Sequence, residues 1–275
     1  MKIINDLSNS DYTTSHGNQL KTRVNDIWYK FDNLGYESAS EFLASELLKY
    51  SNISNFVQYS LCYAKVRGIE HTGCCSKNFL DDGSVLITAD RLFKQNLGTR
   101  YVSKYTKLSP RNRIEYFFDH LFKITKIVNL GEQITKLIEF DAFILNDDRH
   151  LNNIAFIKRG TSYELAPVFD NGSSFLSNLK SFPLDRNLLG FIPLVESNPF
   201  SSLFEEQITL LEESYGRQLS FKINDDSINK SISQIGVYYS NEIADRIKQI
   251  YDFQYAKYRE YFKDYSFDHE VDFYG

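Results

Sequence analysis

Three oxygen-bearing side chains in a set order constrain this chain more than any other feature of its sequence. Asp148 follows a long apolar segment, Asn153 comes five positions later, and Asp170 lies 17 positions beyond Asn153. A carboxylate, an amide and a second carboxylate in this order are typical of phosphoryl transfer from ATP. One acid accepts a hydroxyl proton, and the other two groups hold Mg²⁺ on the phosphates. The pattern predicts a kinase that uses ATP and Mg²⁺.

The segments around Gly160 predict how these groups come together. Residues 153–157 and 163–169 are strand-like, and the glycine between them suits a turn. A hairpin there would bring Asn153 and Asp170 to its open end, where two oxygen ligands can share magnesium. The polar loop before the hairpin would direct its carboxylate at the terminal phosphate.

Spacing alone leaves two assignments open within this loop. Asp147 stands five residues before Asn152, just as Asp148 stands five residues before Asn153. If the strand alternates regularly, only one of the two asparagines points toward the metal. A polar loop without chemistry is the plain alternative, because Asp and Asn often form turns. Asp170, which directly follows an apolar strand, argues against that alternative.

A lysine near the N-terminus supplies a second element of the predicted site. Residues 19–24 and 27–31 are strand-like runs separated by Asn25-Asp26, a pair suited to a tight hairpin turn. Lys30 lies on the second run, on the face opposite to Tyr29. A phosphate-binding lysine on a strand of the small lobe is expected to pair with an acid on the following helix.

That helix is expected within residues 36–52, where apolar side chains recur at helical spacing. Ser38 or Ser40 is the expected N-cap. Glu37, Glu41 and Glu46 all lie on this segment, so each is a candidate partner for the lysine. The residues by themselves do not choose among the three.

The order of elements predicts an α+β, bilobal, protein-kinase-like fold. Residues 1–88 would form a small β-rich N-lobe, and residues 89–275 a larger helical C-lobe. A buried strand within residues 83–93 would lead from one lobe to the other. The nearly all-apolar helix at residues 131–145 is expected at the centre of the C-lobe. The proline-rich stretch 181–200 is expected to be a loop.

Composition excludes several other classes of protein. The net charge is −5, and no long run of Lys and Arg predicts direct nucleic-acid binding. Cys62, Cys74 and Cys75 lack zinc-binding spacing and are expected to be reduced thiols. The start of the chain lacks a signal-peptide core, and no stretch is apolar enough to span a membrane. A cytoplasmic location is therefore expected.

The chain resembles the HipA-type serine/threonine kinases, the toxin kinases of bacterial toxin–antitoxin modules. Residues 148–153 match the family pattern Asp-x-His-x-x-Asn, and residues 165–170 match a Leu-Ala-Pro strand that leads into a metal-binding Asp. The resemblance favours Asp148 as the base and assigns the metal to Asn153 and Asp170. The segment 40–45 resembles the family helix that carries the acidic partner of the lysine, which favours Glu41.

The resemblance also implies features that lie outside the motifs. Phosphorylation of a protein serine or threonine is implied, with a translation enzyme as one expected substrate. Autophosphorylation is expected near Ser15, in the phosphate loop, and the backbone near Ile87 and Ala89 is expected to contact adenine. Only 14 residues precede Ser15, so the N-terminal subdomain of full-length HipA toxins is expected to be missing. An antitoxin or a small companion protein is the expected partner.

Two alternatives keep the same fold. A nucleotide-binding pseudokinase would act as a scaffold in a toxin–antitoxin complex without turnover. A small-molecule or lipid kinase would use the same core, although a lipid kinase predicts a basic membrane-facing patch that the sequence lacks. In every case His150 is expected to hydrogen-bond within the catalytic loop, leaving the role of base to Asp148.

Overall fold

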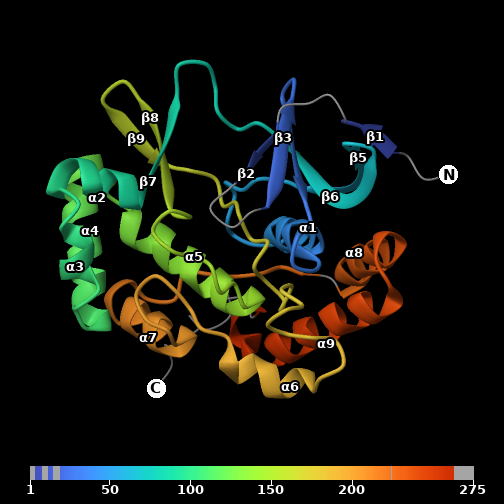
Figure 1. Cartoon of the computed structure of the whole chain (residues 1–275). Coiled ribbons are helices and arrows are strands. Elements are labelled where there is room, and N and C mark those ends of the chain that lie inside the picture. Colours follow the sequence, from blue (N-terminus) through green and yellow to red (C-terminus); the bar gives the residue numbers. More distant parts are fainter. Residues whose placement is uncertain (1–3, 8–11, 15–18, 224, 263–275) are drawn as a thin grey trace, which may run out of the picture.

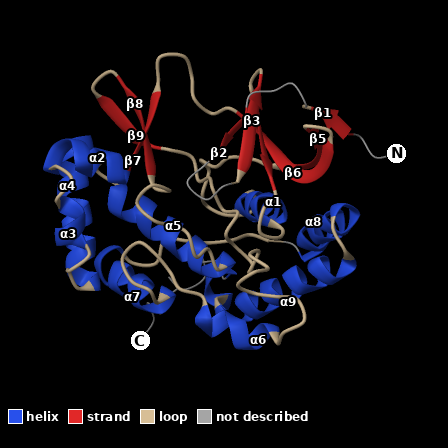
Figure 2. Ribbon diagram, viewed as in Figure 1, coloured by secondary structure: helices blue, strands red, loops and turns tan. Residues whose placement is uncertain are grey.

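The computed structural model describes residues 4–7, 12–14, 19–223 and 225–262. Figures 1 and 2 show the strands gathered in two groups on one side of the molecule, with most helices on the other side. In chain order the elements are β1 (Ile4–Asp6), β2 (Tyr12–Thr14), β3 (Leu20–Val24), β4 (Ile27–Phe31), α1 (Glu37–Leu48), β5 (Ser60–Val66), β6 (Ile69–Lys77), β7 (Val85–Thr88), α2 (Ala89–Leu97), α3 (Tyr101–Tyr105), α4 (Pro110–Thr125), α5 (Leu130–Ile144), β8 (Ala155–Arg159), β9 (Ser162–Leu165), α6 (Leu188–Phe191), η1 (Ile192–Leu194), α7 (Phe204–Tyr215), α8 (Asp225–Tyr238), α9 (Asn241–Lys257) and η2 (Arg259–Phe262).

The N-terminal sheet has six strands in the order β1-β5-β6-β4-β3-β2. β1 runs parallel to β5, and the other neighbours are antiparallel. β3 and β4 form the hairpin that the sequence predicts: Val24 pairs with Ile27 across the turn, and Asn25 adopts a left-handed φ of 54°. The two-residue turn fixes the register, so Lys21 lies directly opposite Lys30 on the same face of the sheet.

Helix α1 begins differently from the prediction, because neither Ser38 nor Ser40 caps it. The N-cap residue is Tyr36, whose side chain makes no capping hydrogen bond. Asp32 instead accepts a hydrogen bond from the Ser38 amide at 2.7 Å. The hydroxyl of Ser40 donates to the Ser174 carbonyl at 2.8 Å, which ties the helix to a loop of the C-lobe. The capping oxygen thus comes from a residue well before the helix, which a local pattern does not reveal.

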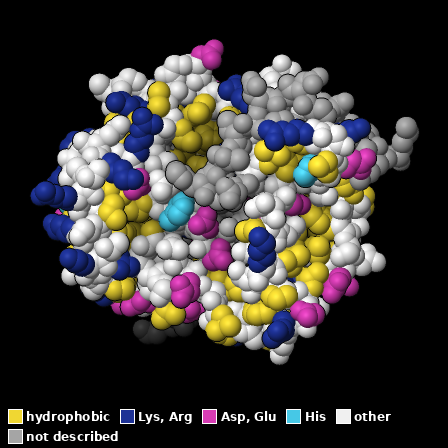
Figure 3. Space-filling view, in the orientation of Figure 1, with side chains coloured by type: hydrophobic (Ala, Val, Ile, Leu, Met, Phe, Trp, Pro, Cys, Tyr) yellow, Lys and Arg dark blue, Asp and Glu magenta, His cyan; other side chains and the backbone are white. Residues whose placement is uncertain are grey.

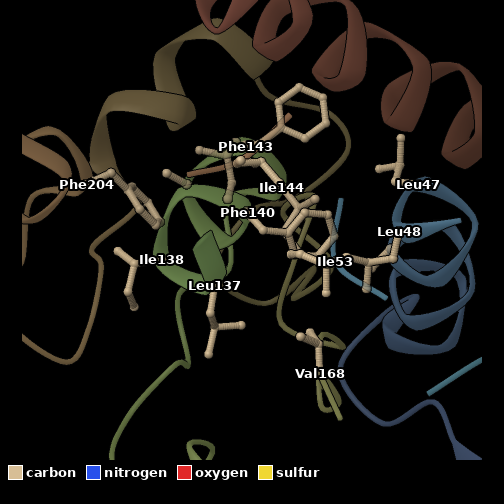
Figure 4. Close-up of a cluster of buried hydrophobic side chains, with 14 of the residues drawn as sticks. Leu47, Leu48, Ile53, Leu137, Ile138, Phe140, Phe143, Ile144, Val168 and Phe204 are labelled. Carbon is tan, nitrogen blue, oxygen red and sulfur yellow. The ribbon is translucent and has the colours of Figure 1, made fainter. Parts of the chain in front are cut away.

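The C-terminal part is built around α5, which is buried on nearly all sides, as its sequence predicts. Figure 4 shows its Leu137, Phe140 and Phe143 packed among side chains from other elements, including Leu48 of α1 and Phe204 of α7. One continuous apolar core therefore runs from α1 into the helical lobe.

The segment 83–93 differs from the prediction, because it does not form a single buried strand. β7 covers only Val85–Thr88, and half of the Val85 side chain is exposed. Thr88 then caps α2 by accepting a hydrogen bond from the Arg91 amide. β7 pairs with β8 in a separate three-stranded sheet, in the order β7-β8-β9. The proline-rich stretch is mostly loop but also contains α6 and η1.

The arrangement is a mixed α/β, bilobal, kinase-like fold, in agreement with the predicted class. The boundary at residue 88 between the two lobes stays a prediction. Within the described ranges, no helix is both long enough and apolar enough to cross a membrane.

Candidate active site

A cavity of about 710 Å³ opens between the N-terminal sheet and the C-terminal part. Figure 3 shows this face of the molecule hollowed, with acidic side chains and a histidine gathered near its centre. The lining includes residues from the N-terminal sheet, the segment before α1, β7, the loop after α5 and the segment after β9: Gln19, Lys21, Asn33, Leu34, Glu37, Leu86, Thr88, Asp147, Asp148, His150, Asn152, Asn153, Phe169, Asp170, Gly172, Ser173, Ser177 and Asn178.

Lys30 joins the two lobes at this cavity. Its Nζ lies 2.5 Å from Oε1 of Glu41 on α1 and 2.7 Å from Oδ1 of Asp170. Burial lowers the pKa of Lys30, but the two carboxylates more than offset this effect, so the pKa is raised and the ammonium stays charged. Of the other two candidate acids, Glu46 pairs with Lys49 at 2.5 Å, and Glu37 accepts hydrogen bonds from backbone amides just before α1.

Asp170 is held in an uncommon backbone conformation, with a φ of 62°. A non-glycine residue with a left-handed φ is costly and tends to occur where the surrounding contacts require it. Here the amide of the next residue, Asn171, donates to Oε2 of Glu41 at 2.8 Å. The charge of Lys30 lowers the pKa of the Asp170 carboxyl, whereas burial raises it. The effect of Lys30 is larger, and the pKa falls to about 2.

Asp148 and Asn153 lie together in the loop between α5 and β8. The side-chain amide of Asn153 donates to the Asp148 carbonyl at 2.7 Å and to its carboxylate at 3.3 Å. His150 Nε2 is 3.7 Å from the same carboxylate. Burial raises the pKa of Asp148, and the charge of Asp170 adds to that rise, which makes Asp148 a better proton acceptor.

The competing pair, Asp147 and Asn152, also lines the cavity but is arranged differently. Asn152 accepts a hydrogen bond from the Thr88 hydroxyl at 3.4 Å, so its side chain faces β7. Burial raises the pKa of Asp147 to about 7, and the neighbouring Asp148 contributes to this rise. The hydrogen bonds therefore link Asp148 with Asn153 and leave Asp147 apart from Asn152.

Arg149, which the sequence analysis did not single out, connects the catalytic loop with the segment around Asp170. Its guanidinium donates to both carboxylate oxygens of the buried Asp141 at 2.8 and 3.0 Å. It also donates to the Asn153 carbonyl at 3.1 Å, the Phe169 carbonyl at 2.7 Å and the Asn171 side chain at 2.6 Å. One planar group thereby sets the distance between the two candidate metal-binding segments.

The donor set suits a magnesium ion bridging protein and phosphate. Asn153 uses its amide nitrogen toward Asp148, which leaves its amide oxygen as an acceptor. The Asp170 side chain is 39% exposed and lines the same cavity. Magnesium usually takes one or two protein oxygens and completes its shell with phosphate and water. The described residues contain no cluster of three His, Cys, Asp or Glu side chains suited to a metal.

Two predicted residues, Ile87 and Ala89, do not line the cavity themselves. Ile87 and Ala89 are buried, whereas their neighbours Leu86 and Thr88 line the cavity. The Ala89 amide already donates to the Ile154 carbonyl at 2.8 Å, so any adenine contact there would involve other backbone groups. Ser15 lies outside the described residues.

Lys21 is a cavity-lining residue that the sequence analysis missed. The signal was present, because a two-residue turn at Asn25-Asp26 places Lys21 as far before the turn as Lys30 is after it. Residues directly opposite each other in a hairpin point to the same face of the sheet. The reasoning that placed Lys30 at the site therefore applies to Lys21 as well.

The fold and the cavity together define a kinase-like protein. The chain superimposes on the Helicobacter pylori proinflammatory kinase CtkA with a TM-score of 0.63 and 16% sequence identity, over 93% of this chain and 95% of that chain. This likeness shows a shared fold. The sequence itself matches no protein-family model and no curated protein.

Two further solved structures are more distant. HipA of Shewanella oneidensis, from a complex of the toxin–antitoxin system HipA and HipB with operator DNA, gives a TM-score of 0.46 at 14% identity, over 84% of this chain and 58% of that chain. A choline/ethanolamine kinase family protein from Mesorhizobium loti gives 0.28 at 10% identity, over 94% and 90%.

Proposed function

We propose that this protein is an ATP-dependent serine/threonine protein kinase of the HipA type. The observation that carries the proposal is the position of Lys30, between Glu41 and Asp170 beside a cavity that also holds Asp148 and Asn153. A lysine paired with a helical acid is the arrangement that protein kinases use to orient phosphates.

Each side chain has a distinct role in the proposed reaction. Lys30 orients the α- and β-phosphates while Glu41 holds the ammonium in place. Asn153 and Asp170 bind Mg²⁺, which neutralises charge on the phosphates when bound. Asp148 accepts the proton of the incoming hydroxyl. The protein contributes positioning and charge, and no covalent intermediate is required.

Other features of the proposal come from the resemblance to the HipA-type kinases. A protein hydroxyl is the proposed acceptor, with a translation enzyme as a candidate, and Ser15 is the proposed site of autophosphorylation. An antitoxin or small companion protein is the proposed partner.

Incubation of the full chain with labelled Mg-ATP and a cell lysate tests the proposal. Labelled protein is the expected product; labelled lipid or metabolite would indicate another kinase class, and no transfer would indicate a scaffold. Asp148→Ala and Asp170→Ala should each abolish transfer, with the melting temperature of Asp148→Ala staying within a few degrees. Asp82→Ala, at an exposed position, is the control and should keep full activity. Mass spectrometry of the purified chain checks for phosphate on Ser15.

A further inference from the structure

We infer that Lys21 is a second phosphate-binding lysine, which acts beside Lys30 on a nucleoside triphosphate. The inference rests on the proposed function and adds a binding residue to it. Lys21 lies near the start of β3, directly opposite Lys30 near the end of β4. Of the two, Lys21 is the one that lines the cavity wall.

The charge of Lys30 is already committed to the protein. Glu41 and Asp170 both contact its ammonium, so two negative charges face one positive charge. Asp148, close enough to Asp170 for their charges to interact, adds another negative charge to the cavity. A triphosphate entering this environment would meet net repulsion from protein groups. A further cation is needed to offset it, in addition to bound magnesium.

Lys21 is the lysine available for this task. The structure gives it no hydrogen bond and no ion pair with any described residue, although its side chain is partly buried. Burial, and then the neighbouring Lys30, lower the pKa of Lys21, and the charges of Asp170 and Glu41 offset only part of this effect. An ammonium that is partly desolvated, unpaired and next to another ammonium is unfavourable in the free protein. An anion in the cavity would relieve all three conditions.

Other cations near the cavity have partners. Arg149 is fully engaged by Asp141 and by backbone and side-chain oxygens in the interior. Arg23, two residues along β3 from Lys21, pairs with Asp26 at the exposed hairpin turn. Lys21 therefore differs from Lys30, Arg149 and Arg23 in having no hydrogen bond or ion pair with a described residue, and it lines the cavity.

Calorimetric titration of the full chain with Mg-ATP and with AMP tests the inference. Lys21→Met should weaken ATP binding by about 10- to 100-fold, the usual effect of losing a charge-assisted hydrogen bond. AMP binding should change by less than about threefold, because the lost contact is to a distal phosphate. Lys21→Arg should retain most of the ATP affinity, and Arg23→Met, on the same strand, should bind like wild type.

A stability readout separates this role from a structural one. Without nucleotide, Lys21→Met should melt at or above the wild-type temperature, because an unpaired, partly buried charge has been removed. The rise in melting temperature on adding ATP should be smaller than in wild type. Equal ATP affinity in Lys21→Met and wild type would overturn the inference and leave the proposed function standing, as would an equal loss of ATP and AMP binding. A wild-type chain that binds no nucleotide would instead overturn the proposed function itself.

Discussion

Arg149 has the largest side chain that is fully buried among the described residues. Its guanidinium donates hydrogen bonds to Asp141, Asn171 and two backbone carbonyls. Its partner Asp141 is buried in the last turn of α5 and also accepts a hydrogen bond from Asn146 at 2.8 Å. A buried ion pair is costly to desolvate and is retained only where additional hydrogen bonds satisfy both groups. Here those bonds reach the segments that carry Asn153 and Asp170, so the pair also serves to position the site.

Replacing Arg149 by Met should lower the free energy of unfolding by about 3–5 kcal/mol, because the Asp141 carboxylate would remain buried without its charge partner. Urea denaturation measures this loss. Arg111→Met is the matched control, since Arg111 pairs with Glu213 on the surface, where both side chains are about half exposed. The effect of Arg111→Met on stability should be close to the error of the measurement, because an exposed ion pair is screened by solvent. Equal costs for the two variants would show that Arg149 does not act as a buried charge.

At the residue scale, the sequence predicted the groups that carry a motif and missed those that depend on tertiary contacts. Spacing predicted Asp170 and left Asp147–Asn152 and Asp148–Asn153 open, and the resemblance to the HipA-type kinases favoured the second pair. Lys21 could have been found from the hairpin register. Asp141 was not identifiable, because it stands among apolar residues of a helix and its partner is set by how the following loop folds back.

At the scale of elements, the start of α1 depends on two acids that precede or begin it. Glu37 accepts hydrogen bonds from the amides of Asn33, Leu34 and Gly35. Asp32 accepts from the Ser38 amide and, through its other oxygen, from the Tyr239 hydroxyl at 2.6 Å. Tyr239 follows α8, so this contact links the helix that carries Glu41 to the C-terminal helices. Burial is the main cause that raises the pKa of Asp32, to about 7.

This raised pKa predicts a pH dependence of stability. The folded protein binds the Asp32 proton more tightly than the unfolded chain, so the group favours folding below about pH 4. This contribution is lost as the pH rises toward about 7. In between, one such group changes the free energy of unfolding by about 1.4 kcal/mol per pH unit.

Asp32→Asn should remove that part of the slope, since an amide does not titrate. Urea midpoints from about pH 5 to about pH 8 measure the difference, with the exposed Asp82→Asn as control. Parallel curves for wild type and Asp32→Asn would contradict the assignment.

Element prediction succeeded where local chemistry determines the structure. The Asn25-Asp26 turn, the hairpin around Gly160 and the apolar periodicity of α5 each specify their element through neighbouring residues. The serine caps were wrong because Asp32, six residues before Ser38, accepts the Ser38 amide in the first turn of α1. The strand within residues 83–93 was overextended because Thr88 works as a helix cap.

At the scale of the whole molecule, the segment before α1 and the segment after Asp170 hold the two lobes together. Tyr36 donates through its hydroxyl to the Phe175 carbonyl at 2.6 Å, and Gly35 forms an isolated bridge with Asn178. On the other flank, the Tyr238 ring stacks on Tyr63 of β5 at a centroid distance of 4.8 Å. Within α1 itself, the Ser40 hydroxyl donates to the Ser174 carbonyl at 2.8 Å, so the helix that carries Glu41 is tied to the C-terminal part, which favours a preformed Lys30–Glu41 pair.

At Gly35 the two segments lie too close for a side chain, which provides a test of their coupling to the site. A Cβ at this position would lie 2.0 Å from the Ser177 carbonyl oxygen, a backbone atom that cannot turn away. Gly35→Ala should therefore force the segments apart, with a loss of about 3 kcal/mol in the free energy of unfolding. Because the same movement displaces α1, kinase activity should fall under conditions in which the variant remains folded.

Gly190→Ala is the matched control, since an added Cβ there meets nothing within 4 Å. Chemical denaturation and phosphate transfer, measured on both variants, distinguish the outcomes. Full activity in a destabilised Gly35→Ala would mean that the contact between the lobes supports the fold without positioning the Lys30–Glu41 pair.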